Sequence, residues 1–235
     1  MSFRFLHTND FHGTCRGAVL DRLMQLRAEV DLYFDSGDCI KAGNLAIPLK
    51  PEEAWKNLDA LRCTAGTLGN RESHVLAAGQ KAKVAGAQHP LLVSNMVDRK
   101  GELVFQESMT LGVDGVRIGV LGVMVPMVTE RMKSQAASAY LWKPPIATAA
   151  RVVEKLRPEV DLLIALTHIG ISEDRKLAQQ VAGIDFILGG HSHTVLATPE
   201  RLGTTWICQG GSHGRFAGVY EWSGGVLTGG LVSLS

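Results

Sequence analysis

The sequence lacks several signals that would indicate a membrane-bound, secreted or nucleic-acid-binding protein. No uninterrupted apolar run approaches the ~18 residues of a membrane-spanning helix. Lys and Arg number 24 against 23 Asp and Glu, for a net charge of +1, and like charges form no long run, so nothing indicates a nucleic-acid-binding surface. The first polar motif begins so close to Met1 that no room is left for a signal peptide. We therefore expect a soluble, cytoplasmic protein with no membrane or nucleic-acid partner.

Cysteine is also sparse. The four cysteines are Cys15, Cys39, Cys63 and Cys208, and none of them lies in a CxxC pair. This spacing argues against a zinc ribbon or a disulfide framework, so we expect reduced thiols that pack as small hydrophobic side chains. Hydrophobic residues make up 46% of the sequence, which is enough to bury a core. With no linker or internal repeat, residues 1–235 are expected to form a single domain.

Strand-like and helix-like patterns alternate along much of the chain. Apolar strand-like runs are found at residues 3–7, 31–35, 64–68, 161–166 and 185–188. Helical patterns are found at residues 15–30, 51–61, 75–84, 145–156 and 173–181. This alternation predicts an α/β fold in which two mixed sheets pack together and helices cover both outer faces. The expected layers are therefore helix, sheet, sheet and helix.

The middle and the end of the chain contain more strand signals. Further strand-like runs are found at residues 91–94, 104–111 and 116–123. The Asp114-Gly115 pair before the last of these runs predicts a hairpin turn. Residues 124–143 fit neither pattern, and we expect an irregular crossing segment there. Residues 204–209 and 218–235 are expected to add antiparallel strands.

Five short polar segments each follow a strand-like run. They are Asp10-Phe11-His12, Gly37-Asp38, Gly69-Asn70, Thr167-His168 and Gly190-His191-Ser192-His193. Because strands of such folds present their carboxyl ends at one edge, we expect these distant segments to converge. Asp, Asn and His side chains suit hard or borderline divalent metals such as Mn, Zn, Fe or Mg. A carboxylate-rich cluster that bridges two cations indicates hydrolysis of phosphate esters.

With their neighbours, these motifs resemble the calcineurin-like metallophosphoesterase superfamily, and within it the 5'-nucleotidase branch. The matching segments are LHTNDFHG at 6–13, SGD at 36–38, LGNRE at 68–72, TH at 167–168 and GGHSH at 189–193. Residues 92–95 (LVSN) and 209–218 (QGGSHGRFAG) resemble further stretches of that branch. The resemblance covers about residues 3–220, and it implies the same α/β fold as the element pattern.

The resemblance implies a centre of two divalent metal ions, which are Mn, Zn, Fe, Mg or a mixture. One ion would be held by Asp10, His12, Asp38 and His193. The other would be held by Asp38, Asn70, His168 and His191. Asp38 would bridge the two ions, because a carboxylate can direct one oxygen to each cation. A metal-bound hydroxide would then be the nucleophile that attacks a phosphate ester or anhydride.

Arg71 departs from the usual pattern, in which His follows the motif Asn. The resemblance makes Asn70 and Arg71 the catalytic pair, but an arginine binds phosphate and does not readily release a proton. Loss of a general acid costs about 10²- to 10⁴-fold in rate for leaving groups that need one. Enzymes that cleave UDP-diacylglucosamine at its pyrophosphate have a similar Gly-Asn-Arg-Asp motif, which favours an anhydride or an activated ester as substrate. His74 is an alternative acid.

The 5'-nucleotidases that resemble this chain also carry a carboxy-terminal domain that stacks on the nucleobase. The sequence ends at Ser235, so we expect that domain to be absent and the substrate to be a small phosphorylated compound, nucleotide-like or otherwise. Arg71 and His213 are the predicted substrate-binding residues, although His213 fits an ordinary loop position equally well. An alternative is a catalytically weak metal-binding or regulatory protein on the same fold. The oligomeric state is left open.

Overall fold

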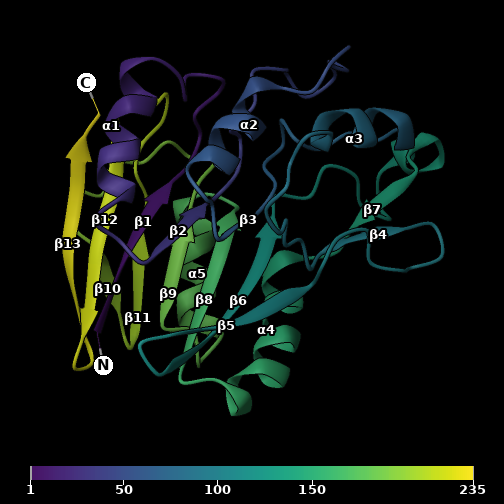
Figure 1. The fold of residues 1–235 in the computed structure, drawn as a ribbon. Coiled ribbons are helices and arrows are strands. Elements are labelled where there is room, and N and C mark those ends of the chain that lie inside the picture. Colours follow the sequence, from purple (N-terminus) through teal and green to yellow (C-terminus); the bar gives the residue numbers. More distant parts are fainter. Residues whose placement is uncertain (1, 235) are drawn as a thin grey trace.

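The apolar run at the start of the chain lies at the centre of the first of two large sheets. The computed structural model describes residues 2–234 (Figure 1). In spatial order, this sheet contains β13 (Val226–Ser233), β12 (Phe216–Ser223), β1 (Ser2–Thr8), β2 (Leu32–Asp35) and β3 (Ala65–Gly66). Strands β1, β2 and β3 are parallel, and β12 and β13 continue the sheet in antiparallel fashion. The carboxyl ends of the three parallel strands therefore meet at one edge.

The second sheet is built mainly from the strongly apolar runs of the later half of the chain. Its spatial order is β10 (Glu200–Leu202), β11 (Thr205–Cys208), β9 (Phe186–Gly189), β8 (Leu162–His168), β6 (Val116–Met124) and β5 (Ser108–Val113). The four central strands are parallel, and the two edge strands are antiparallel to their neighbours. Asp114 and Gly115 form the turn between β5 and β6 with φ values of 47° and 76°, as the hairpin signal predicts.

Helices cover the outer face of each sheet. α1 (Ala18–Arg27) and α2 (Glu53–Ala60) pack on the first sheet, and α4 (Pro145–Leu156) and α5 (Ile171–Gln180) pack on the second (Figure 1). α3 (Ala77–Val84) lies beside the end of the first sheet. The predicted order of helix, sheet, sheet and helix is confirmed. Among residues 2–234, no helix combines the length and the apolar character that spanning a bilayer requires.

Aromatic side chains fill the space between the two sheets. Phe5 of β1 contacts Phe34 of β2 and Phe186 of β9, with ring centroids 6.3 and 5.8 Å apart. Phe186 also meets Trp222 edge-on at 5.2 Å. Rings at these separations stabilise a core beyond the area that they bury. The aromatic residues therefore fix the spacing of the sheets whose edges carry the polar motifs.

Several short elements were not expected from the sequence. β4 (Met96–Asp98) pairs with β7 (Tyr140–Trp142), and a short 3₁₀ helix, η1 (Lys133–Ala137), precedes β7. Residues 124–143 are thus partly regular rather than wholly irregular. The prediction of a strand at residues 91–94 was wrong, because this segment makes only isolated bridges. Residues 204–209 were expected to be antiparallel, but β11 is parallel to β9 and antiparallel only to β10.

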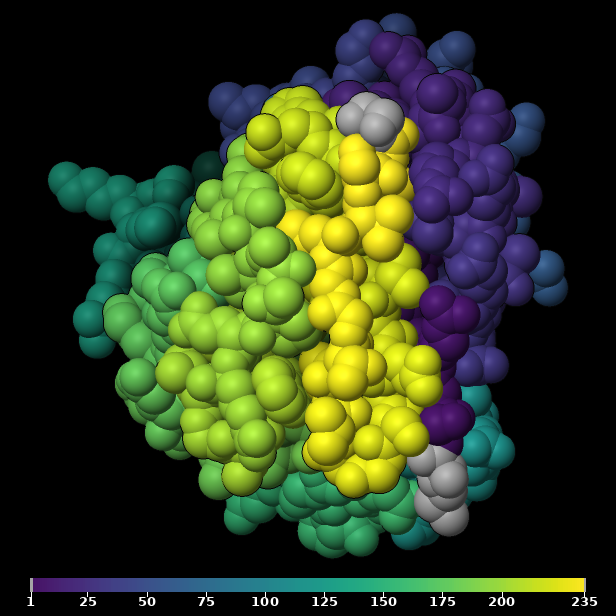
Figure 2. Space-filling model, turned by 90° about the vertical axis from the view of Figure 1, so that its left-hand side faces the viewer, coloured from purple at the N-terminus to yellow at the C-terminus, as the bar shows by residue number. Residues whose placement is uncertain are grey.

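The surface formed by the end of the chain can be followed in Figure 2, where β13 lies exposed between the purple amino-terminal segments and the green segments of the second half. All four cysteines are free and buried, as expected for thiols that pack as small hydrophobic side chains.

A buried acid, Asp174 of α5, lies under the end of β8. Its Oδ1 accepts a hydrogen bond from the Thr167 hydroxyl at 2.6 Å, whereas its Oδ2 has no hydrogen-bond partner within residues 2–234. Burial raises the pKa of Asp174 to about 8, against its ordinary value of 3.8. The folded protein therefore keeps this carboxyl protonated at neutral pH, whereas the unfolded chain releases the proton.

We expect the free energy of unfolding to fall as the pH rises from about 4 to about 8, because only the folded state holds the Asp174 proton in that window. Asp174→Asn removes this dependence. Urea unfolding of both proteins at pH 5 and pH 8 measures it, with Asp21→Asn on the exposed face of α1 as the control. The variant should gain stability relative to the native protein at pH 8. An equal difference at both pH values would contradict the assignment.

Candidate metal centre

The five polar motifs meet where the carboxyl edges of the two sheets adjoin. Asp10, Asp38 and Asn70 follow β1, β2 and β3 of the first sheet. His168 is the last residue of β8, and the segment from His191 to His193 follows β9 of the second sheet. Hydrogen bonds join the loops, since Asp10 N donates to Gly37 O at 2.9 Å and His12 N donates to Asp38 O at 2.8 Å. The predicted convergence of the motifs is therefore present in the structure.

The backbone of the site is held in an unusual conformation. Among residues 2–234, eight residues other than glycine have positive φ, and six of them belong to the predicted site. These six are Asp10, His12, Asp38, His191, His193 and His213. Such conformations cost free energy and persist only where the surrounding structure enforces them, most often at functional sites. The loops are thus shaped to turn these side chains toward a common point.

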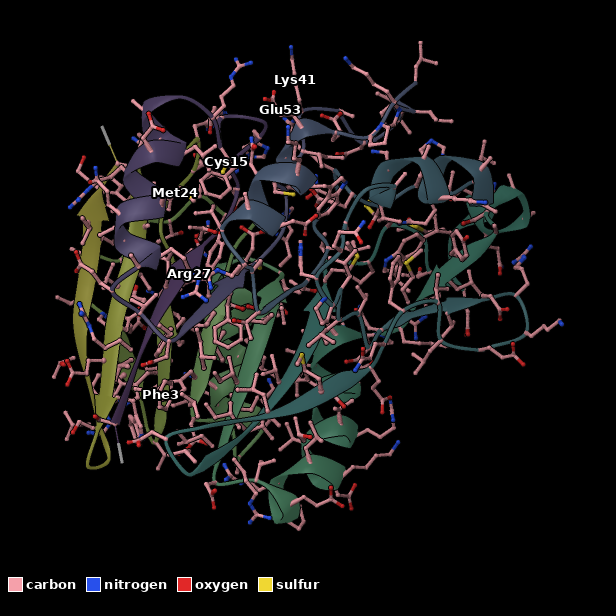
Figure 3. The ribbon with its side chains drawn as sticks, viewed as in Figure 1. Phe3, Cys15, Met24, Arg27, Lys41 and Glu53 are labelled. Carbon is pink, nitrogen blue, oxygen red and sulfur yellow. The ribbon has the colours of Figure 1, made fainter. Side chains whose placement is uncertain are left out.

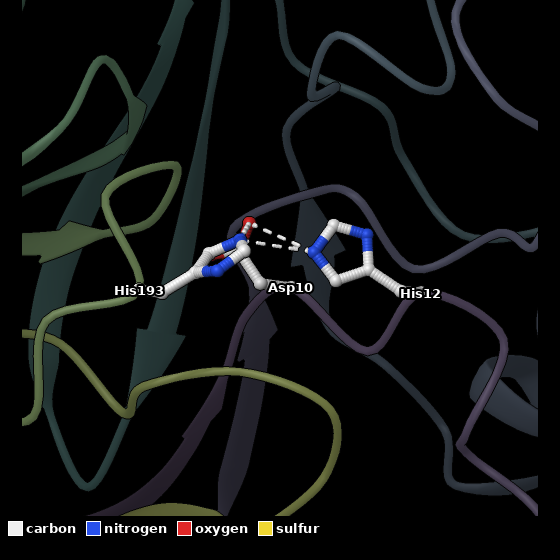
Figure 4. A group of neighbouring side chains, drawn as sticks. All are labelled: Asp10, His12 and His193. Atoms are coloured by element: carbon white, nitrogen blue, oxygen red, sulfur yellow. Dashed lines mark hydrogen bonds and ion pairs between the residues drawn. The ribbon is translucent and has the colours of Figure 1, made fainter.

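One group of side chains consists of Asp10, His12 and His193 (Figure 4). Asp10 Oδ1 lies 3.3 Å from His193 Nε2 and 3.7 Å from His12 Nε2. The two imidazole nitrogens are 3.0 Å apart. The Asp10 and His12 side chains are almost fully buried, whereas that of His193 is 41% exposed. This group is therefore open to solvent on the His193 side.

A second group shares Asp10 and adds Asp38 and His168. His168 Nε2 lies 3.6 Å from Asp38 Oδ1 and 3.9 Å from Asp10 Oδ1. The other ring nitrogen, Nδ1, donates a hydrogen bond to Ser36 O at 2.7 Å, which leaves Nε2 facing the carboxylates. A backbone carbonyl of this kind is a common outer partner of a metal-ligating histidine, because it fixes the tautomer and the ring orientation.

The donor atoms of these groups fit divalent cations. Asp10 Oδ1 and His168 Nε2 are buried without a hydrogen-bond partner within the described residues 2–234, and the inward-facing His12 Nε2 has only the imidazole nitrogen of His193 within reach. Asp10 Oδ2, by contrast, accepts hydrogen bonds from Asn9 Nδ2 and His191 N. Buried polar atoms are rarely left without partners, and carboxylate oxygens and imidazole nitrogens suit Mn, Zn or Fe. A cation would satisfy the atoms that the protein itself leaves unpaired.

Asn70 and His191 lie beside these groups. His191 Nδ1 is 3.0 Å from Asn70 Oδ1, and the His191 and His168 rings have centroids 5.1 Å apart. All seven predicted ligands therefore lie together. The geometry includes Asp10 in both three-residue groups and Asp38 in one, and Asp38 Oδ2 also lies 3.9 Å from His12 Nδ1. The bridging role of Asp38 stays a prediction.

The surroundings of the site shift the pKa values of two of its histidines in opposite directions. Burial and the nearby Arg71 charge together lower the pKa of His12 to about 4, and the Asp38 and Asp10 carboxylates offset only part of this shift. Burial also lowers the pKa of His168, but the negative charges of Asp38 and Asp10 beside its ring outweigh that effect and raise the pKa to about 9. His12 is accordingly neutral and ready to bind a metal, whereas a metal at His168 must displace a proton.

Arg71 and His213 lie at the border of the site. Arg71 Nε is 4.0 Å from Asp38 Oδ2, and its side chain is 29% exposed. The His213 ring packs on the ring of His12, with centroids 4.7 Å apart, and its backbone N donates to Asp10 O. His74 is engaged elsewhere, because its Nδ1 accepts a hydrogen bond from Leu76 N at the start of α3. Its ring lies so close to Gly79 that a Cβ there would approach it to 2.3 Å.

Two positioning residues were not identified from the sequence. The buried Glu72 carboxylate accepts hydrogen bonds from the backbone N atoms of Asp38, Ile40 and Gly69. Asn9 holds Asp10 Oδ2 and also accepts a hydrogen bond from Gly210 N. The only sequence signal was position, since Asn9 lies in the quoted segment 6–13 and Glu72 in the quoted segment 68–72. Their partners are distant backbone groups, which no local pattern reveals.

Comparison with known proteins finds relatives over most of this chain. Residues 3–195 match the family of calcineurin-like phosphoesterases. YunD, an uncharacterized metallophosphoesterase of Bacillus subtilis strain 168, is 25% identical over 234 residues, covering 93% of this chain and 49% of YunD. An apyrase of Tabanus yao is 33% identical over 151 residues, covering 61% of this chain and 26% of the apyrase. The chain thus spans about half the length of the first relative and less of the second.

A solved structure extends the likeness in fold to nearly the whole chain. The 5'-nucleotidase precursor of Thermus thermophilus superposes with a TM-score of 0.79 at 19% identity, covering 99% of this chain and 54% of that one. At this identity the superposition shows the fold alone. The family match includes all seven residues with predicted ligand side chains. The chain belongs to the calcineurin-like phosphoesterase family.

Proposed function

We propose that the protein is a dinuclear metal-dependent phosphoesterase that hydrolyses an ester or anhydride bond of a small phosphorylated compound. The observation that carries this proposal is the pair of unpaired buried atoms, Asp10 Oδ1 and His168 Nε2, which converge from the two sheets beside Asp38, His12 and His193. Relatives named as an apyrase and a 5'-nucleotidase support a nucleotide-like substrate. The organisation as one catalytic domain remains a prediction.

We propose that the seven predicted ligands hold the two metals, with Asp10, His12 and His193 on the more exposed side. Asp38 and His168 would hold the more buried metal, with Asn70 and His191 completing its ligands. When bound, such cations supply a water of lowered pKa and neutralise the charge of a phosphate. The protein contributes fixed ligand geometry, because the loops that carry the ligands are bonded to one another.

Arg71 is proposed to bind the phosphate. Its guanidinium lies near Asp38 and is partly exposed, so it can donate hydrogen bonds to phosphate oxygens in front of the metals. A guanidinium does not readily release a proton, so Arg71 is a poor proton donor to the leaving oxygen. His213, which packs on His12, is proposed to contact the substrate from the opposite side. The site thus favours substrates whose leaving groups depart without a proton.

The metal assignment predicts that replacing different ligands removes different amounts of bound metal. Asp10→Ala and Asp38→Ala should each remove most of both metals, since Asp10 lies in both groups of the structure and Asp38 is the bridge in the family pattern. His193→Ala should lose only the metal on the exposed side. Elemental analysis after loading with Mn and desalting measures the content. If both carboxylate variants retained two metals, the proposed centre would be wrong.

The chemistry of Arg71 predicts a dependence on the leaving group. Aryl phosphates and phosphoanhydrides should be hydrolysed faster than alkyl monoesters such as nucleoside monophosphates, because no strong acid serves the leaving oxygen. A plot of log kcat/KM against leaving-group pKa should therefore slope steeply. A flat plot would indicate that an acid is present. The absence of turnover by metal-loaded protein on esters, diesters and pyrophosphates would favour the catalytically weak regulatory protein.

Two variants of Arg71 complete this test. Arg71→Ala should lower kcat/KM by about 10- to 100-fold, since a hydrogen bond to a charged group contributes about 1.5–3 kcal/mol. Arg71→His should shift the preference toward poor leaving groups, because an imidazole can donate a proton near neutral pH. The metal content of both variants should equal that of the native protein, which serves as the control. An unchanged kcat/KM in Arg71→Ala would exclude Arg71 from the substrate site.

A further inference from the structure

A loop of residues 41–44, here the 41–44 loop, packs against the turn that carries Asn70. Asn70 Nδ2 donates a hydrogen bond to Asn44 Oδ1 at 2.9 Å. Asn44 itself is exposed on the surface. An exposed side chain therefore contacts a predicted metal ligand from the side that faces away from the centre.

The direction of this hydrogen bond decides which end of the Asn70 amide faces inward. A carboxamide has a donor end, Nδ2, and an acceptor end, Oδ1. Because Nδ2 points to Asn44, Oδ1 points to the centre, where it lies 3.0 Å from His191 Nδ1. A divalent cation binds a carboxamide through its oxygen. The opposite orientation would present an NH₂ group, which cannot act as a ligand.

The 41–44 loop is itself held by a buried lysine of α3. Lys83 is fully buried as a residue, and its Nζ donates hydrogen bonds to Gly43 O at 2.8 Å and to Arg71 O. Burying an ammonium group is costly unless it is hydrogen-bonded, so these two carbonyls help to stabilise it there, together with the negative charges of Glu72 and Asp38. One cation thereby connects the 41–44 loop to the turn at Asn70 and Arg71.

The same loop restrains the Arg71 guanidinium. Arg71 Nη1 donates to Lys41 O at 2.9 Å, and Arg71 N donates to Asp38 Oδ1 at 2.8 Å. The Lys41 side chain points outward, away from the sheets (Figure 3), so Lys41 acts here only through its backbone. Four hydrogen bonds from Asn70, Arg71 and Lys83 thus tie the loop and the turn together.

We propose that Asn44 and Lys83 are positioning residues of the metal centre. Asn44 keeps the oxygen of Asn70 directed at the metal, and Lys83 holds the loop that carries Asn44. The inference rests on the proposed function only for the presence of the metals. It assigns to an exposed loop residue a role that local burial and charge would not indicate.

Asn44→Ala tests the first part. It should weaken the binding of one of two Mn²⁺ ions by about 10- to 100-fold, the usual cost of losing an outer partner of a ligand, and leave the other ion unaffected. Isothermal titration calorimetry with Mn²⁺ measures both sites. The melting temperature without metal should not change, because the side chain is exposed. Asn44→Asp, which retains an acceptor at the same place, should restore the affinity.

Leu45→Ala is the matched control, because Leu45 neighbours Asn44 and is 83% exposed. It should bind both ions as the native protein does. Native affinity at both sites in Asn44→Ala would overturn the inference. A failure of Asn44→Asp to restore binding would do the same. Calorimetry needs no turnover, so native protein that binds two metals but hydrolyses no phosphate would refute the proposed function and leave this inference standing.

Lys83→Met tests the second part in combination with Asn44→Ala. If Lys83 acts by holding the loop, its loss should weaken the same metal, and the double variant should lose little more than the worse single variant. Independent, additive losses would contradict a shared path through the loop. Should Lys83→Met fail to fold, the Asn44 series still decides whether the loop positions Asn70.

Discussion

Asp10 uses its two carboxylate oxygens differently, and the arrangement of the candidate site depends on that division. Oδ2 accepts hydrogen bonds from Asn9 Nδ2 and from the backbone N of His191, which belongs to the second sheet. Oδ1 is left facing His12, His168 and His193. The same carboxylate therefore joins the loops of two sheets and supplies an unpaired oxygen between them. An amide side chain has only one oxygen, so it could not fill both roles.

Steric limits explain why one motif has glycine at position 69, close to the Asp38 carboxylate. A Cβ on Gly69 would lie 2.1 Å from Asp38 Oδ1, so any side chain there would collide with the carboxylate. Glu72 then binds the backbone of both loops through a buried carboxylate. These contacts surround the Asp38 backbone, which has a positive φ value of 55°.

Local sequence patterns identified the elements whose apolar residues repeat regularly. The helix predicted at residues 145–156 has those bounds in the structure, because Pro145 starts it and its apolar residues share one face. The Asp114-Gly115 turn was equally clear. β4 and β7 were missed because each has three residues, and their pairing depends on contacts between distant segments. Residues 91–94 are apolar but bridge single residues of two different segments.

The candidate ligands could be predicted because their order is a family pattern, and all seven converge. Asn9, Asn44 and Glu72 could not, since their role lies in hydrogen bonds to residues or backbone groups outside their own segment. Which of Asp10 and Asp38 belongs to both groups of metal-binding side chains depends on interatomic distances. The order of the motifs in the sequence does not give these distances.

The free thiols make it possible to observe separate parts of the molecule opening. Burial raises the pKa of Cys39 and Cys208 above the usual thiol range, and an alkylating reagent attacks only the thiolate. In the folded protein both are therefore protected. Cys39 directly follows Asp38, whereas Cys208 ends β11 of the second sheet. The relative labelling rates of these two positions report how often the metal-binding loop detaches while the second sheet stays intact.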